Sequence, residues 1–346
     1  MQCFLQYRVK RTEKQALICK PFCALLTTLP QDTILVSEKM SKMKEYRMER
    51  PSGRAEEVQR EGVTQFDIGI AQIVVRFSAP FAMEVAPELR PFLTQGGTPQ
   101  EHYRFTAAHE VPCGDAPPIA RLPSISVYRA EGGQLRVFHN LRAPDGNCAA
   151  VLLRENGMHT VYLPESDLAR YTSNCTMAPL LCGEYLFYRH AAMLLHSSLV
   201  SWAGEAILFC GASGAGKSTQ AKLWRRYRNA DVLNGDRCVI RRREARFWGY
   251  GSPFCGSSGI YRPEGAPIRA VFFPEKAETL SVTPLSPVQA LRRLYPQLTV
   301  NTWDTAFLQR ITDLLSRFAM EVPAFCLRCR PDEAAVQAAQ EAMEKI

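Results

Sequence analysis

The amino-acid sequence predicts an α/β (α+β) protein in which a smaller β-rich region precedes an α/β domain. From Thr64 to about Leu163, short alternating strands are separated by glycine and proline turns such as Gly132-Gly133, a pattern typical of an antiparallel β region. From Ala206 to Tyr227, an apolar strand, a glycine-rich loop and a helix follow one another. We therefore divide the chain into a poorly ordered N-terminal extension (1–62), a β-rich region (63–177) and the α/β domain (178–346).

The N-terminal extension combines mixed charge with weak periodicity, which predicts poor order. Residues 1–60 carry +5 of the net charge of +8, so the basic balance is no evidence for a nucleic-acid partner. Met40 and Met43 are alternative start positions. The extension lacks the apolar core of a signal peptide, and no apolar run approaches about 18 residues. The sequence thus predicts a cytoplasmic protein that binds neither nucleic acid nor membrane.

Twelve cysteines without a secretion signal predict reduced thiols. Cys210 and Cys238 lie in apolar strands and are expected in the core. Cys326 and Cys329 form a C-x-x-C motif that has no second pair of ligands in the chain. Because residues three apart on a strand face opposite sides, a packing role is favoured over a metal or redox role.

The α/β domain is predicted to begin with a helix from Pro179 to Leu195, which places His196 at the first residue of a strand ending at Trp202. The Ala206–Cys210 strand follows through a tight turn. The elements expected after the loop are a strand broken by a polar turn (230–240), a hairpin and loop (246–256), strands at 268–273 and 322–327, helices at 287–295 and 305–318, and a last helix with Pro331 in its first position.

The glycine-rich segment Gly211–Thr219, GASGAGKST, fits the pattern G-x-x-x-x-G-K-[ST]. Its glycines let backbone N–H groups turn toward phosphate oxygens, and the following helix adds the positive end of its dipole. Lys217 is expected at the β- and γ-phosphates, and Ser218 at Mg²⁺. The alternative is a glycine turn without a ligand. The predicted nucleotide-binding residues are Gly211, Ala212, Ser213, Gly214, Ala215, Gly216, Lys217, Ser218 and Thr219.

Lys217 is also a predicted catalytic residue, and two further residues, Asp236 and His196, are candidates for catalysis. Asp236 is the first acid after Lys217 that leads into an apolar strand, which favours a Mg²⁺ ligand over a simple turn aspartate. His196 can take the proton of an acceptor hydroxyl, or it is a packed strand histidine. A basic cluster forms either a solvated face or an electropositive rim; its members are Lys222, Arg225, Arg226, Arg228, Arg237, Arg241, Arg242, Arg243 and Arg246.

This part of the chain contains, in order, a histidine, a strand, a glycine turn, a second strand, the loop G-x-S-G-x-G-K-S and a carboxylate. This order of features resembles the catalytic domain of HPr kinase/phosphorylase. The resemblance covers His196 to Ile240 best. It implies a phosphoenolpyruvate carboxykinase-like P-loop fold that binds ATP and Mg²⁺, with Ser218 and Asp236 as metal ligands and His196 near the transferred phosphoryl group. It also implies a kinase that acts on a hydroxyl of a protein, peptide or small molecule, and a possible homo-oligomer.

The sequence departs from this family at Gly235. The family has two adjacent aspartates before an arginine, and the first aspartate is associated with activating the acceptor hydroxyl, whereas this chain reads Asn234-Gly235-Asp236-Arg237. Two hypotheses follow. Either His196 or another group takes the proton in an ATP-dependent phosphotransferase, or the chain is a nucleotide-binding regulatory or scaffold module with degenerate catalysis. A transport ATPase is disfavoured, because the sequence contains no LSGGQ-like motif.

Overall fold

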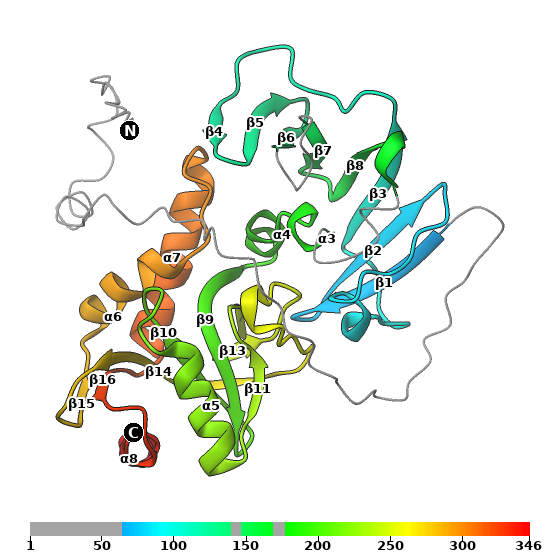
Figure 1. Cartoon of the computed structure of the whole chain (residues 1–346). Coiled ribbons are helices and arrows are strands. Elements are labelled where there is room, and N and C mark those ends of the chain that lie inside the picture. The colour runs from blue at the N-terminus through cyan, green and yellow to red at the C-terminus, as the bar shows by residue number, and fades with distance from the viewer. Residues whose placement is uncertain (1–63, 140–146, 169–176) are drawn as a thin grey trace, which may run out of the picture. The chain divides into compact units, whose positions relative to one another are not determined.

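The structure of the 346-residue chain is a computed structural model that describes residues 64–139, 147–168 and 177–346 (Figure 1). The poorly ordered extension predicted for residues 1–62 lies outside the described residues. All described residues fall within one compact unit, Glu49–Ile346. Within them, no helix combines the length and the apolar character needed to cross a bilayer. The fold is mixed α/β with two large sheets, each of eight strands.

The first sheet has the strand order β1-β2-β3-β8-β7-β6-β5-β4. Its pairs are antiparallel except at β3, which runs parallel to both β2 and β8. The prediction of an antiparallel region is therefore wrong at this strand. The long connection between Ala79 and Glu101 permits a parallel return, which a tight hairpin cannot make. The strands are β1 (Thr64–Ile70), β2 (Ile73–Ala79), β3 (Glu101–Ala108), β4 (Ala120–Leu122), β5 (Ile125–Ala130), β6 (Gly133–His139), β7 (Asn147–Arg154) and β8 (Met158–Pro164).

The core of the first sheet extends into the helices that follow it. Alternating side chains of β1 and β2 are buried, as period-two patterning requires. The rings of Phe66, Phe77 and Tyr103 stack in this core. Helices α3 (Met177–Leu180) and α4 (Gly183–Arg189) contribute buried side chains to the same cluster. The core thus continues past residue 177, where the sequence suggested a border.

The predicted helix from Pro179 to Leu195 is wrong over its second half. After α4, the chain enters the long strand β9 (Ala192–Trp202), and Ala191 has a left-handed φ of 51° at the junction. Leu194 packs into the core of the first sheet, whereas Leu195 packs into that of the second. A strand buried on both faces reads as a continuous apolar run, which periodicity does not distinguish from a buried helix. His196 is therefore an interior residue of β9.

The second sheet has the order β10-β9-β12-β13-β14-β16-β15, with β11 also paired to β9. Because β10 also pairs with β14, five strands form a closed ring of pairings. Parallel pairs join β10 to β14 and β14 to β16. The strands are β10 (Glu205–Cys210), β11 (Asp231–Asn234), β12 (Arg237–Arg243), β13 (Arg246–Tyr250), β14 (Gly265–Lys276), β15 (Ser281–Pro284) and β16 (Ala324–Cys329).

Four helices complete this half: α5 (Lys217–Arg228), α6 (Pro287–Leu294), α7 (Thr305–Glu321) and α8 (Glu333–Glu344). The helices expected at 287–295 and 305–318 and the strands expected at 268–273 and 322–327 are confirmed with small shifts of their ends. The last helix instead begins at Glu333, because the Asp332 side chain accepts the N–H of Ala335 as an N-cap. The predicted first position at Pro331 is wrong. The sequence predicted a hairpin and a loop within residues 246–256. The segment instead supplies one strand, β13, which pairs with β12 to form a hairpin.

Candidate functional site

The glycine-rich loop joins the end of β10 to the start of α5. Three of its glycines, Gly211, Gly214 and Gly216, have φ values of 148°, 81° and 108°. An L-residue with a side chain rarely adopts these conformations, so the glycines allow the tight curl. Gly216 is the N-cap of α5 and provides no side-chain hydrogen bond to the first turn. The first N–H groups of α5 therefore keep the capacity to bind an anion.

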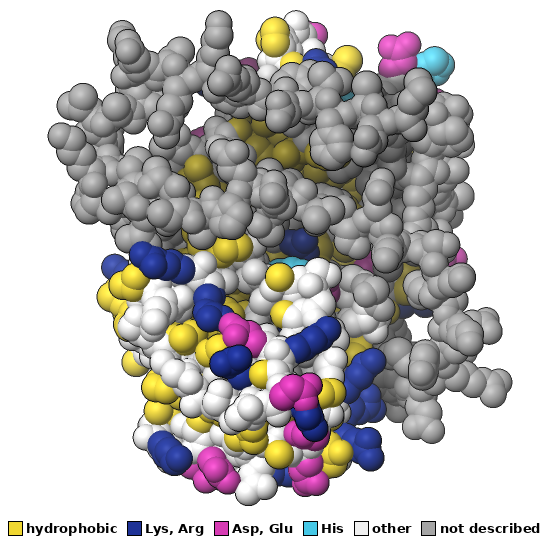
Figure 2. All heavy atoms as spheres, turned by 60° about the vertical axis from the view of Figure 1, so that its left-hand side comes forward, with side chains coloured by type: hydrophobic (Ala, Val, Ile, Leu, Met, Phe, Trp, Pro, Cys, Tyr) yellow, Lys and Arg dark blue, Asp and Glu magenta, His cyan; other side chains and the backbone are white. Residues whose placement is uncertain are grey.

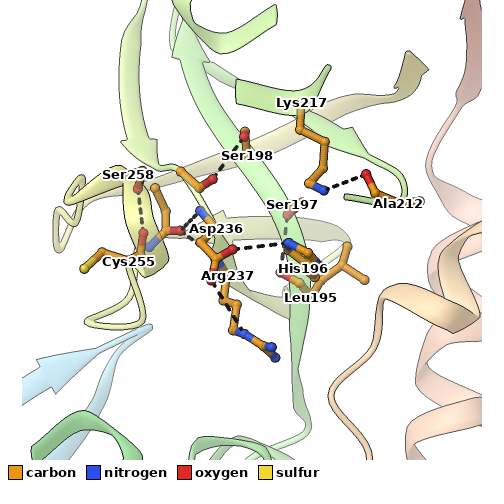
Figure 3. Close-up of polar contacts among 12 residues, drawn as sticks. Leu195, His196, Ser197, Ser198, Ala212, Lys217, Asp236, Arg237, Cys255 and Ser258 are labelled. Atoms are coloured by element: carbon orange, nitrogen blue, oxygen red, sulfur yellow. Dashed lines mark hydrogen bonds and ion pairs between the residues drawn. The ribbon is translucent and has the colours of Figure 1, made fainter. Parts of the chain in front are cut away.

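Lys217 is the only charged side chain of this loop, and only 7% of its surface is exposed. Its Nζ donates to the carbonyl oxygens of Gly211 (2.7 Å) and Ala212 (3.2 Å), so the ammonium is folded over the loop (Figure 3). Burial lowers the pKa of Lys217, and the negative charge of Asp236 partly opposes this change. Ser218 and Thr219 are exposed.

His196 lies at the point where the loop leaves the sheet. The last residue of β10, Cys210, pairs with Ser197 of β9. The neighbouring residue on β9 is His196, which pairs on the other side with Arg237 of β12. The strand register therefore brings the start of the loop, His196 and Arg237 into one row across the sheet.

The predicted catalytic residues His196 and Asp236 are in contact. His196 Nε2 lies 3.2 Å from Asp236 Oδ1, and the two side chains are 31% and 29% exposed. Burial raises the pKa of Asp236, but the hydrogen bond with His196 and the charges of Arg237 and Lys217 outweigh it and lower the pKa overall. The carboxylate is thus ionised and orients the imidazole through Nε2.

Asn234 holds the turn that presents Asp236. Its side chain is completely buried, and its Oδ1 accepts the backbone N–H groups of Asp236 and Arg237, both at 2.8 Å. Asparagine commonly closes turns in this way. Its Nδ2 donates to the carbonyl oxygen of Ser252. Sequence reasoning did not assign Asn234, although the Asn-Gly pair is a turn signal that points to it.

Gly235 packs against Ser258. A Cβ atom at Gly235 would lie 2.3 Å from Ser258 Oγ and 2.4 Å from Ser258 Cβ. The Ser258 hydroxyl donates to the carbonyl oxygen of Cys255 (2.6 Å) and accepts the N–H of Ile260 (3.2 Å). Ser258 therefore fills the space that any side chain at position 235 would need. Nothing in the sequence pattern pointed to this contact.

Arg237 extends from β12 toward the segment before α7. Its Nη1 donates to Thr299 Oγ1, and its Nε lies 3.7 Å from Asp236 Oδ2. The backbone N–H of Thr299 donates to the carbonyl oxygen of Leu194 on β9. Thr299 was not predicted from the sequence, because it contacts the site through a hydrogen bond with a residue 62 positions away in the chain.

The other members of the basic cluster lie in varied surroundings. Arg241 donates to the carbonyl oxygen of Ala71, Arg242 pairs with Glu321, and Arg246 pairs with Glu205. On the face drawn in Figure 2, basic and acidic side chains are interspersed over the described part. By contact, Arg237 is the member of the cluster that belongs to the His196–Asp236 site.

The four cysteines singled out in the sequence are buried in the structure. Cys210 and Cys238 are fully buried, which confirms the prediction that they are core residues. Cys326 and Cys329 are buried free thiols, and Gln220 Nε2 donates to Cys329 Sγ at 3.3 Å. Among the described residues, no group of three or more histidine, cysteine, aspartate or glutamate side chains is placed to hold a metal ion.

A second charged cluster was missed because its histidines have no regular spacing. Glu101 is fully buried on β3, and its Oε2 contacts His159 Nε2 at 2.8 Å. Its Oε1 accepts from Arg189 Nε (2.7 Å) and contacts His190 Nε2 (2.8 Å). The cluster fastens the first sheet to the end of α4, just before β9 begins.

The chain was compared with protein families, curated proteins and solved structures. No family model matches the chain, and no curated protein matches it. Among solved structures, the chain is similar to the Hpr(Ser) kinase/phosphatase from Coxiella burnetii, with 10% sequence identity and a TM-score of 0.29. The match covers 44% of this chain and 97% of that chain.

Proposed function

We propose that this chain binds ATP and Mg²⁺ at the glycine-rich loop, a P-loop of the phosphoenolpyruvate carboxykinase-like type. We further propose that it transfers the γ-phosphoryl group to an acceptor hydroxyl. The observation that carries the proposal is the strand register that sets the loop beside the His196–Asp236 pair. Phosphoryl transfer depends mainly on positioning and charge neutralisation, and this row of residues supplies both.

The residues of the loop fit a bound polyphosphate. The start of α5 has no side-chain cap, and Lys217 is a buried ammonium whose hydrogen-bond partners within the chain are carbonyl oxygens. Phosphate oxygens would offset the desolvation that lowers the pKa of Lys217. The exposed Ser218 hydroxyl and the Asp236 carboxylate are oxygen ligands of the kind that Mg²⁺ takes together with substrate phosphates. The ion would neutralise charge on those phosphates.

His196 is the proposed general base. Because its Nε2 contacts Asp236, Nδ1 is the ring nitrogen left to accept a proton from the acceptor. The acceptor oxygen forms a bond to the γ-phosphorus while the bond to the bridging oxygen of ADP breaks, and the hydroxyl proton passes to Nδ1. Asp236 then stabilises the positive imidazole through Nε2.

The second candidate is a nucleotide-binding regulatory or scaffold module. It is favoured by the contact between Gly235 and Ser258, because Ser258 occupies the space that a carboxylate side chain at position 235 would need. In this alternative, ATP binds at the loop without phosphoryl transfer.

The test compares Lys217→Ala with Lys222→Ala. Lys222 is exposed five residues later on α5, so its variant changes the net charge equally without touching the loop. Titration calorimetry with ATP and Mg²⁺ is expected to show at least tenfold weaker binding for Lys217→Ala and little change for Lys222→Ala. Equal affinity in both variants would exclude the loop as the nucleotide site.

Transfer is measured separately with γ-labelled ATP and hydroxyl acceptors. His196→Ala is expected to slow transfer about 10²–10⁴-fold with ATP affinity unchanged, since the base acts on the acceptor and not on the nucleotide. Binding of ATP without label transfer to any acceptor would support the scaffold module instead.

A further inference from the structure

We propose that Arg237 forms an anion-binding subsite for the phosphoryl acceptor, so that the acceptor carries a carboxylate or phosphate group next to its reacting hydroxyl. The inference rests on the proposed function, because it names the substrate class of the same site. It is carried by the position and hydrogen bonding of the Arg237 guanidinium.

Arg237 and His196 project from the same face of the second sheet. They are directly opposite partners in the antiparallel pair of β12 and β9. Side chains of such partners lie side by side, with Cβ atoms about 5 Å apart. A molecule that offers a hydroxyl to His196 therefore comes within reach of the Arg237 side chain.

The guanidinium lies on the side of His196 away from the glycine-rich loop. The loop leaves the sheet beyond Ser197, whereas the anchor of the guanidinium, Thr299, is bonded to the backbone of Leu194. Leu194 is two residues from His196, which is about 7 Å along a strand. Figure 3 likewise shows the Lys217 and Arg237 side chains on opposite sides of His196. Lys217 thus faces the nucleotide, and Arg237 faces the space for the acceptor.

The guanidinium keeps donors for a ligand. Its side chain is 39% exposed, Nη1 is used by Thr299, and Nε is 3.7 Å from Asp236 Oδ2. Nη2 makes no hydrogen bond with any other described residue. The planar guanidinium suits carboxylate and phosphate groups, and Asp236 is already engaged with His196. The site therefore has a positive charge available to an anionic acceptor.

Two matched pairs of probes test the acceptor class. Glycerate and glycerol differ in a carboxylate on a small hydroxyl compound, and a serine peptide flanked by aspartate or by asparagine differs in the same way on a peptide. Label transfer from γ-labelled ATP is expected to favour the anionic member of at least one pair by about tenfold or more. The preferred pair identifies whether the anion belongs to a small molecule or to a peptide.

The preference is expected to disappear in Arg237→Gln through a higher KM for the anionic probe, and to return in part in Arg237→Lys. Arg317→Gln is the control, because Arg317 is exposed on α7 and its loss changes the net charge equally. Equal transfer to charged and neutral probes, unchanged in Arg237→Gln, would overturn the subsite and leave the proposed function intact.

A binding readout keeps the subsite testable without turnover. Glycerate and the aspartate-flanked serine peptide are titrated in separate experiments while the ring protons of His196, assigned with His196→Gln, are followed by NMR spectroscopy. The shift is expected to persist in Lys217→Ala, which removes the cation of the loop, and to vanish in Arg237→Gln. A shift that vanishes only in Lys217→Ala, or no shift in the native protein with either probe, refutes the subsite whether or not ATP is a substrate.

Discussion

Introducing a side chain at position 235 is expected to destabilise the fold through a clash with Ser258. A Cβ atom there would meet Ser258 Cβ at 2.4 Å, so Ser258 must move by about 1 Å to reach ordinary contact at 3.4 Å. Rotation of the hydroxyl gives no relief, because the Cβ atom itself is too close. The φ of Gly235 is not positive, so the cost is steric and not conformational. Overpacking of this kind costs about 1–3 kcal/mol, which is the expected effect of Gly235→Ala.

A double-mutant cycle with Ser258→Gly isolates this contact. Ser258→Gly removes both clashing atoms and the two hydrogen bonds of the hydroxyl, so it is itself expected to cost about 1–2 kcal/mol. In that background, Gly235→Ala should cost less than about 0.5 kcal/mol, which gives a coupling energy of about 0.5–3 kcal/mol. Urea unfolding followed by tryptophan fluorescence measures each free energy. The same cost for Gly235→Ala in both backgrounds would refute the steric argument.

Three further predictions concern buried groups. Glu101→Gln should cost about 3–5 kcal/mol in urea unfolding because it breaks a buried ion cluster. Burial raises the pKa of Glu101, but hydrogen bonds from its basic partners outweigh this effect and hold the pKa below 4.5. The native protein should therefore lose stability as the pH falls below about 4.5. Stability that does not change in this acid range would contradict the prediction. Burial lowers the pKa of Lys217 below 10.5, so its ammonium loses its proton earlier as the pH rises. ATP affinity measured by calorimetry should therefore begin to fall before the rising pH reaches 10.5 in the native protein, and Lys217→Ala should show no such fall. Trp224→Ala should cost about 3–5 kcal/mol by the same unfolding assay, because the indole is completely buried; a cost under about 1 kcal/mol would count against its place in the core.

The sequence predicts those parts of the fold that short-range rules determine. The strand before the loop, the helix after it and the helices at 287–294 and 305–321 have clear periodicity and turn signals, and they are confirmed. The helix expected up to Leu195 fails because β9 is buried on both faces and therefore has no alternating pattern. Element limits and strand identity thus depend on tertiary contacts that one sequence does not reveal.

The same limit applies to the candidate site. The loop was predicted from its motif, and His196 and Asp236 were predicted as catalytic candidates; the structure brings these two side chains into contact. Ser258 and Thr299 were missed, because each contributes through contacts with residues 23 and 62 positions away in the chain. Serine and threonine in loops have no sequence pattern that separates such contacts from ordinary solvent exposure.

A buried ion pair connects the first sheet to the segment that carries Thr299. Arg136 of β6 is 2% exposed and pairs with Glu184 of α4. In the side-chain amide orientation of Asn301 that allows both hydrogen bonds, its oxygen accepts from Arg136 Nη2 (3.0 Å) and its nitrogen donates to Glu184 Oε1 (3.1 Å). A buried pair adds little net stability compared with apolar packing, but it fixes the relative position of the groups it joins. Asn301 lies two residues after Thr299, so this pair connects the first sheet to the segment that holds Arg237 in place.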